Sequence, residues 1–418
     1  MNLIIRQAKI IDRKSQHHNK TADIKIENGI IAEIGSRIED AGNFDVLELE
    51  NLHISQGWFD SSVSLGEPGF EDRETISNGL AAAARSGFAA IAMQPNCIPV
   101  LDSQSGISFV KSKSAASAAD LFPIGALTKA SEGKDMAELF DMKNAGAVAF
   151  GDYNKSLADG NLLKIALQYV QDFDGLVIAY SQDSGIKGSG VANEGPVSTR
   201  LGLKGIPALA EELQISRNLF ILEYTGGKLH IPTISTARSA SLVKEAKARG
   251  LNVTCSAAVH NLVLTDEKLN GFDTRFKVTP PLRAESDREA LVEAVKEGVI
   301  DMITSDHSPI DIEQKKMEFD LAKNGTIGLE SAFGALMTVL PLEIIIEKFL
   351  SGRKIFGIGS HTIEEGSQAS LSLFNPEGRW IFDKQHILSK SKNAIFLKHE
   401  LKGRAYGIIN NSCLVLNK

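Results

Sequence analysis

Eight short apolar runs, separated by helical stretches between residues 56 and 356, constrain the fold more than any other feature of the sequence. They are too continuously apolar for half-exposed antiparallel strands and are typical of a parallel sheet covered by helices. Eight such β/α units predict a closed (β/α)8 barrel of the TIM type, with a doubly wound open sheet as the alternative. The runs span residues 59–65, 88–94, 121–127, 145–151, 176–180, 228–235, 252–258 and 300–306.

The helices between the runs carry start and stop signals. Ser286 and Glu289 have the spacing of a capping box, which predicts a helix that opens there and stops at Gly298. A second helical stretch is predicted to stop at Gly250. Because catalytic groups of a barrel lie at the carboxyl ends of its strands, the residues that follow each apolar run are the candidates for a site.

The two ends of the chain differ from the middle and resemble each other. The first 50 residues alternate polar and apolar side chains, with Asn28-Gly29 as a hairpin turn, and the last 50 have the same β texture. We expect one small sheet domain built from residues 1–55 and 357–418, flanking a barrel of residues 56–356. Two independent edge hairpins are the alternative.

Composition excludes several classes of protein. A net charge of −7 over 418 residues gives no electrostatic reason for binding nucleic acid or an anionic membrane. The three cysteines (Cys97, Cys255 and Cys413) lie far apart without a CxxC pair, which argues against a disulfide framework or a thiolate zinc site. The sequence has no 18-residue apolar run and no signal peptide, so we expect a cytoplasmic protein.

A family resemblance covers nearly the whole chain. Residues 57–103 read GWFDSSVSLGEPGFEDRETISNGLAAAARSGFAAIAMQPNCIPVLDS, and SGVANEG, VTPPLRAESDREAL, GVIDMITSDHSP and GTIGLES follow in order. This sequence resembles the dihydroorotases. The resemblance implies an amidohydrolase-type barrel flanked by a β-sandwich. It also implies a zinc-dependent reaction of pyrimidine biosynthesis, the reversible cyclisation of carbamoyl-aspartate to dihydroorotate.

The family's chemistry depends on its metal. Zinc lowers the pKa of bound water from about 16 to about 7 and polarises the carbonyl under attack. Imidazole and carboxylate ligands hold such a metal and leave one position open, and a nearby carboxylate moves the proton.

The chain departs from the family at these ligands. The family's first strand ends in Asp-x-His-x-His-Leu-Arg, whereas the stretch from Asp60 reads DSSVSLG. Of six expected ligand positions only Asp306 keeps its group, and the five replacements are Ser62, Ser64, Tyr153, Tyr180 and Thr233. Neutral hydroxyls are poor zinc ligands. We therefore expect no zinc cofactor, and a barrel mouth lined by these replacements.

The expected substrate contacts are also eroded. Asn96 matches a family contact, or is simply a turn residue before Pro99. The other three contact positions have lost their groups and hold Gly66, Thr279 and Ile310. Arg283 is interpreted as a loop anchor. Asp306 is either a catalytic base or a hydrogen-bonded residue that holds its loop.

No other histidine is placed to rescue the metal site. None of the nine forms an HxH or HExxH pattern. His230 is predicted to point away from the ligand position. His260 follows a strand, and we expect a structural role for it, with a place at the mouth as the alternative. His307 is expected to lie behind the pocket.

Three functional hypotheses follow. The first is a dihydroorotase-family protein without hydrolase activity, kept as a structural or regulatory partner, with aspartate carbamoyltransferase as the candidate and a homodimer as the expected assembly. The second is an active dihydroorotase or related cyclic-amide hydrolase that uses Asp306, Asp152 and Tyr153. The third is a small-molecule binding protein that uses the same mouth.

Overall fold

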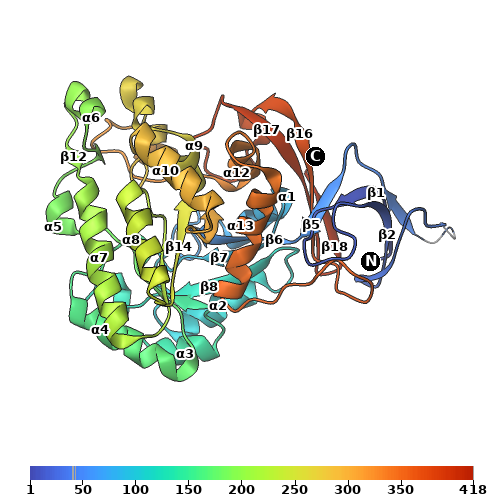
Figure 1. Ribbon diagram of the computed structural model, residues 1–418, viewed down its shortest axis with the longest axis horizontal. Coiled ribbons are helices and arrows are strands. Elements are labelled where there is room, and N and C mark those ends of the chain that lie inside the picture. Colours follow the sequence, from blue (N-terminus) through green and yellow to red (C-terminus); the bar gives the residue numbers. More distant parts are fainter. Residues whose placement is uncertain (40–41, 43, 418) are drawn as a thin grey trace.

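The computed structural model describes residues 1–39, 42 and 44–417 as a barrel with a β-sheet domain packed at one side (Figure 1). The amino and carboxyl termini both lie in the sheet domain. The barrel strands follow one another in chain order around the sheet, and every neighbouring pair is parallel. They are β6 (Trp58–Val63), β7 (Phe88–Met93), β8 (Asp120–Gly125), β9 (Ala149–Phe150), β10 (Val177–Ile178), β13 (Leu229–Ile231), β14 (Val253–Ala258) and β15 (Met302–Thr304).

The first and last strands meet and close the barrel. Val63 forms a parallel bridge with His307, and the amide of Ser64 donates to the carbonyl of His307 at 2.7 Å. Each strand overlaps one predicted apolar run. The barrel prediction is therefore confirmed, and the doubly wound alternative is wrong.

Helices cover the outside of the barrel, and shorter ones lie in the loops after the strands. The covering helices are α1 (Ile76–Arg85), α2 (Gln104–Ser114), α3 (Leu139–Asn144), α4 (Gly160–Tyr169), α7 (Ala208–Thr225), α8 (Ala237–Ala248), α10 (Glu285–Lys296) and α13 (Leu342–Ile355). The loop helices are α5 (Ser184–Lys187), α6 (Pro196–Leu201), α9 (Val259–Val263), α11 (Ile312–Lys315) and α12 (Leu329–Leu336), and a short parallel pair joins β11 (Ala192–Asn193) to β12 (Gly205–Ile206).

The predicted capping box of α10 is wrong. The helix begins at Glu285, two residues earlier than a cap at Ser286 would allow, and it has no side-chain cap. Asp287 instead accepts a hydrogen bond from the first amide of α8 at 2.9 Å, so this carboxylate joins two helices. The stop signals are correct, because Gly298 (φ +78°) and Gly250 (φ +83°) follow α10 and α8 in the left-handed conformation that glycine adopts without strain.

The sheet domain joins both ends of the chain, as predicted. Its strand order is β18-β17-β16-β5-β1-β2-β3, with β4 beside β1. The antiparallel pairing of β5 with β16 connects the two halves, so the alternative of independent hairpins is wrong. The strands are β1 (Leu3–Ile10), β2 (Thr21–Glu27), β3 (Ile30–Gly35), β4 (Asp45–Leu47), β5 (His53–Gln56), β16 (Leu371–Ile381), β17 (Glu400–Asn410) and β18 (Cys413–Leu416).

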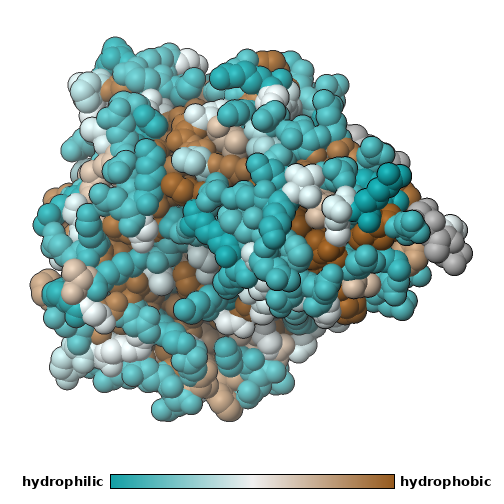
Figure 2. Space-filling view, turned by 45° about the vertical axis from the view of Figure 1, so that its right-hand side comes forward, coloured by the Kyte–Doolittle hydropathy of each residue, from teal (hydrophilic) through white to brown (hydrophobic). Residues whose placement is uncertain are grey.

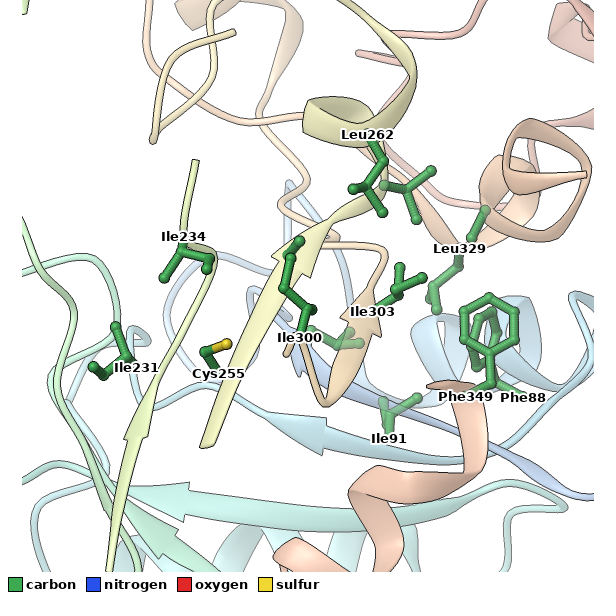
Figure 3. Close-up of a cluster of buried hydrophobic side chains, with 14 of the residues drawn as sticks. Phe88, Ile91, Ile231, Ile234, Cys255, Leu262, Ile300, Ile303, Leu329 and Phe349 are labelled. Atoms are coloured by element: carbon green, nitrogen blue, oxygen red, sulfur yellow. The ribbon is translucent and has the colours of Figure 1, made fainter. Parts of the chain in front are cut away.

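An aromatic cluster couples the two domains. Trp58 at the start of β6 is fully buried, with ring centroids 5.2 Å from Phe349 of α13 and 5.4 Å from Phe374 of β16. Figure 3 shows Phe349 lying against Phe88 of β7, at a centroid distance of 5.1 Å. Because one cluster takes side chains from barrel and sheet domain, we expect the two to unfold together.

The surface is largely hydrophilic in Figure 2, with hydrophobic residues gathered in hollows, one of them on the side of the sheet domain. None of the helices formed by the described residues has the length and apolar character needed to cross a membrane.

Replacing Phe374 by alanine should lower the free energy of unfolding by about 3–5 kcal/mol, because it opens a cavity in the shared cluster. The control is Ile381→Ala on the same strand, where the side chain is half exposed and the loss should be about 0.5 kcal/mol. Urea unfolding followed by circular dichroism measures both. Equal losses, or two separated transitions in the native protein, would contradict the shared core.

Candidate functional site at the barrel mouth

A small polar cavity lies where the carboxyl ends of the barrel strands converge. Its volume is about 10 Å³. The sequence-predicted residues that meet there are Ser62, Tyr153, Tyr180, Thr233, Thr279 and Asp306. Their strands are far apart in the sequence, so closure of the barrel is what brings them together.

Four of the sequence-predicted residues do not line this cavity: Ser64, Asn96, Gly66 and Ile310. The expectation that Ser64 lines the mouth is therefore wrong. The Ser64 hydroxyl instead accepts a hydrogen bond from the side-chain amide of Asn96 at 2.9 Å. A side chain at Gly66 would place its Cβ 1.9 Å from the carbonyl oxygen of Phe70, so this backbone has no room for the family's arginine. Ile310 is buried in the loop after β15.

Asp306 is held in a chain of hydrogen bonds. The hydroxyl of Ser62 donates to the Asp306 carboxylate at 3.3 Å, and Gln94 donates to the same hydroxyl at 3.1 Å. The pKa of Asp306 is raised to about 7, and burial is the largest cause. The negative charge of Asp60 also raises this pKa, and the hydrogen bond from Ser62 lowers it by a smaller amount. Asp306 therefore keeps its proton to a higher pH than an exposed aspartate does.

Asp60 joins the first and last barrel strands. Its carboxylate accepts hydrogen bonds from the Ser305 amide at 2.9 Å, the Ser62 amide at 3.1 Å and the Thr304 hydroxyl. Burial raises its pKa in spite of these donors. Two of these hydrogen bonds join β6 to the end of β15, and the third is to Ser62 within β6 itself. The role of Asp60 in this chain is therefore structural.

Two tyrosines fill the space next to Asp306. The hydroxyl of Tyr180 lies 3.0 Å from that of Thr279. Burial raises the pKa of Tyr153 and of Tyr180 well above the usual range of a phenol, and the charge of Asp306 adds to the rise at both. Neither phenol therefore ionises at neutral pH to act as a base or an anionic metal ligand.

The backbone at the mouth is strained. Tyr153, Thr233 and Asp306 have φ values of +55°, +47° and +48°, in the left-handed region that non-glycine residues rarely adopt. Such residues cost about 1–3 kcal/mol each and gather at functional sites. All three are positions at which the family resemblance led us to expect a metal ligand.

The histidines do not contribute to the cavity. His230 is bonded through both ring nitrogens, to Thr254 at 3.0 Å and Ser256 at 3.1 Å, and burial lowers its pKa to about 3. His307 lies behind the mouth as predicted, where its Nδ1 accepts from the Gly328 amide at 3.2 Å. His260 is buried away from the lining, and burial lowers its pKa to about 3 as well.

The donors at the mouth do not fit zinc. The cavity offers one carboxylate, that of Asp306, and otherwise neutral hydroxyls and amides. Throughout the part of the chain that the structure describes, no three His, Cys, Asp or Glu side chains are arranged to hold a metal ion. A catalytic zinc needs three imidazole, carboxylate or thiolate ligands, and this cavity supplies only Asp306.

Asp152 and Arg283 serve the scaffold. The Asp152 carboxylate accepts from the amides of Leu127 and Thr128, both at 3.0 Å, and points away from the cavity. The catalytic grouping of Asp306, Asp152 and Tyr153 is therefore not assembled. Arg283 is a buried loop anchor, as interpreted from the sequence, and donates to Asn193 at 3.0 Å.

Sequence reasoning missed part of the lining. Gln94, Asn154, Ile178 and Pro232 also face the cavity. Gln94 is the last residue of an apolar run, so the rule that strand ends face the mouth was sufficient to find it.

Curated relatives match the whole chain. A dihydroorotase from Pelotomaculum thermopropionicum is 40% identical over 423 residues, covering 100% of this chain and 99% of the relative. One from Geobacter metallireducens is 38% identical and covers 97% of each. The chain belongs to the dihydroorotase family. The family described as Dihydro-orotase-like matches residues 53–239, which include β6 and its DSSVSLG stretch.

Solved structures support the fold. The L-hydantoinase from Arthrobacter aurescens has a TM-score of 0.83 at 19% identity, covering 99% of this chain and 97% of its own. A dihydropyrimidinase from Brevibacillus agri has a TM-score of 0.83 at 20% identity, covering 100% of this chain and 95% of its own. At these identities the likeness concerns the barrel and its sandwich domain alone.

The Asp306→Asn variant should gain stability over the native protein as pH rises. The carboxyl titrates near pH 4 when unfolded and near 7 when folded, so its stabilising effect is present below pH 4 and lost as pH rises through 7. The difference in free energy of unfolding should shift by roughly 2–3 kcal/mol in favour of the variant between pH 5 and pH 8. Urea unfolding at both pH values measures the shift.

The exposed Asp172→Asn variant is the control and should show no such shift. A pH-independent difference for Asp306→Asn would show that Asp306 is ionised throughout this range.

Gly66→Ala should destabilise the protein by about 1–3 kcal/mol, since the added Cβ collides with the Phe70 carbonyl. Gly271→Ala is the matched control, because a Cβ there meets open space. Thermal unfolding compares the two. A neutral Gly66→Ala would show that this loop adjusts and that room for an arginine remains.

Proposed function

We propose that this chain is a dihydroorotase-family protein that has neither zinc nor hydrolase activity and acts as a structural or regulatory partner in pyrimidine biosynthesis. The observation that carries the proposal is the barrel mouth, where five hydroxyl side chains and one partly protonated carboxyl surround a cavity of about 10 Å³.

The size of the cavity argues against substrate binding. A space of about 10–15 Å³ holds one water molecule, whereas small-molecule sites span about 300–1,000 Å³. A cyclic amide would require both Tyr153 and Tyr180 to move. The same argument disfavours the third hypothesis, a binding protein that uses this mouth.

The chemistry of the remaining groups argues against hydrolysis. Without a metal, the population of hydroxide at neutral pH is about eight orders of magnitude smaller than with zinc-bound water. A general base such as Asp306 restores about 10²–10⁴-fold. The rate of hydrolysis without zinc would therefore stay several orders of magnitude below that of a zinc enzyme.

The partner that we propose is aspartate carbamoyltransferase, with the chain itself as a homodimer. This choice is supported by the family resemblance, because some non-catalytic dihydroorotase-like chains assemble with that enzyme. A partner role would also account for a fold that persists in full around a mouth that has lost its ligands.

A second candidate function is that of an active dihydroorotase with an atypical site. It is favoured by the full-length relatives, which are named dihydroorotases at 35–40% identity. In that case Asp306 would act as the base, with Tyr153 beside it.

Elemental analysis and a dihydroorotase assay of the purified full-length chain, with and without added zinc, separate the two. We expect less than about 0.1 zinc per chain and no turnover above that of the Asp306→Asn variant. The dihydroorotase from Geobacter sulfurreducens, 38% identical, is the positive control. Turnover that requires zinc and disappears in Asp306→Asn would establish the second candidate instead.

The partner role has its own test. The chain and the aspartate carbamoyltransferase of the same organism should co-elute from size-exclusion chromatography as one complex. Separate elution at micromolar concentrations would show that this enzyme is not the partner. It would not affect the proposal that the chain lacks hydrolase activity, which the assay tests.

A further inference from the structure

Helix α7 presents a hydrophobic stripe to solvent on the side of the barrel that lies away from the sheet domain (Figure 1). The whole helix lies in the described part of the chain, and five of its residues are exposed. One of them, Glu223, is charged, and the other four are large hydrophobic residues. These are Leu209, Leu213, Phe220 and Tyr224, with exposed fractions of 54%, 49%, 66% and 79%. A surface helix normally turns polar residues to water, so the stripe indicates contact with another chain.

The two helices beside α7 differ from it and from each other. On one side, α8 has the usual polar surface, with Arg238 paired to Glu245 at 3.8 Å and Lys244 paired to Glu297 at 2.7 Å. On the other side, the exposed residues of α4 carry no charge. They are Asn161, Ile165, Gln168 and Tyr169. The stripe therefore continues onto α4 and is bordered by charged groups at α8, the pattern of an apolar interface core with a polar rim.

The charged groups along the stripe are largely engaged within the chain. Glu223 pairs with Arg249 of the segment after α8 at 2.9 Å. Arg217 donates to the carbonyls of Leu157 at 2.6 Å and Ala158 at 2.8 Å. Glu212 is half-buried at the edge of the stripe. Such a face favours an apolar partner surface over an acidic or a basic one.

The stripe has the same spacing when it is read from either end. Leu209 and Leu213 are four residues apart, as are Phe220 and Tyr224, and both halves are centred on one point between Ser216 and Arg217. A two-fold axis through this point, perpendicular to α7, relates the helix to an antiparallel copy. It places Leu209 opposite the partner's Tyr224 and Leu213 opposite the partner's Phe220. A two-fold interface requires this kind of self-complementarity, so the spacing favours a second copy of this chain as the partner.

The size of the face is sufficient for a dimer. With a rise of about 1.5 Å per residue and a width of about 10 Å per helix, the outer faces of α4, α7 and α8 cover roughly 600 Å². Two copies would bury about 1,200 Å², the lower end of the range for stable interfaces.

We propose that two copies of this chain form a homodimer through antiparallel packing of α7 along this stripe. A groove of about 490 Å³ lies between α7 and α8 and is lined by Ser216, Phe220, Leu242 and Ala248, among others. The partner's Leu213, which lies opposite Phe220, is the side chain placed to enter it. This surface belongs to the homodimer that we propose above, and its assignment rests on that part of the proposed function.

Sedimentation velocity of the full-length chain at micromolar concentrations tests the surface. The native chain should have twice the mass of one chain. Phe220→Glu should have the mass of one chain, with dimerisation weakened at least about 100-fold, because a carboxylate is buried twice across the axis. Phe109→Glu is the matched control, since Phe109 is an exposed aromatic residue on α2, and it should remain a dimer.

The contrary outcomes are distinct. A Phe220→Glu variant that remains a dimer would overturn the α7 surface and leave the homodimer standing. A native chain with the mass of one chain would overturn both. If that monomer also co-elutes with aspartate carbamoyltransferase and Phe220→Glu does not, the stripe binds that enzyme instead of a second copy. None of these results bears on zinc content or hydrolysis.

A charge exchange tests the antiparallel register. Leu213→Lys alone should also be a monomer. The double variant Leu213→Lys/Phe220→Glu places each lysine opposite the partner's glutamate, so the dimer should form again and dissociate as the salt concentration rises. Circular dichroism checks that each variant keeps the native fold. A folded double variant with the mass of one chain would overturn this register and with it the proposal.

Discussion

The carboxylate of Asp60 is the contact on which the geometry of the barrel mouth depends. It accepts hydrogen bonds from Ser62 on β6 and from Thr304 and Ser305 at the end of β15, and so ties together the strands that close the barrel. A buried carboxylate in this place imposes a negative charge on its surroundings. The nearest group that responds is Asp306, whose pKa is raised by burial first and by Asp60 second. The carboxylate that closes the barrel thus also adds to the effect of burial on the pKa of Asp306.

The barrel mouth combines a strained backbone with side chains that are mostly neutral. Tyr153, Thr233 and Asp306 are in the left-handed conformation, and two of these three residues carry hydroxyls where the family resemblance led us to expect metal ligands. The new groups bind one another: Gln94 donates to Ser62, and Tyr180 pairs with Thr279. A polar network of this kind satisfies its own buried atoms without a metal. The strained backbone is typical of a functional site, whereas the side chains pack against one another and leave a cavity of only about 10 Å³.

Much of this architecture could be predicted from the sequence, because apolar runs and strand ends are local signals. The eight runs predicted the barrel, and the resemblance to the dihydroorotases predicted Ser62, Tyr180 and Asp306 at its mouth. Features set by distant contacts could not be predicted. The capping box at Ser286 had the right spacing, but the structure uses Asp287 to hold α8. A cleft beside Arg353 exists only because the sheet domain packs on α13, and no pattern within either segment indicates it.

The proposed function depends on a barrel mouth that does not hold a metal ion. Crystals of the full-length chain soaked in zinc, with diffraction data collected on both sides of the zinc absorption edge, test it directly. We expect no anomalous peak within bonding distance of Asp306, and a mouth still filled by Tyr153 and Tyr180. A zinc peak at full occupancy beside Asp306, with Ser62 or Thr233 drawn toward it, would contradict the account.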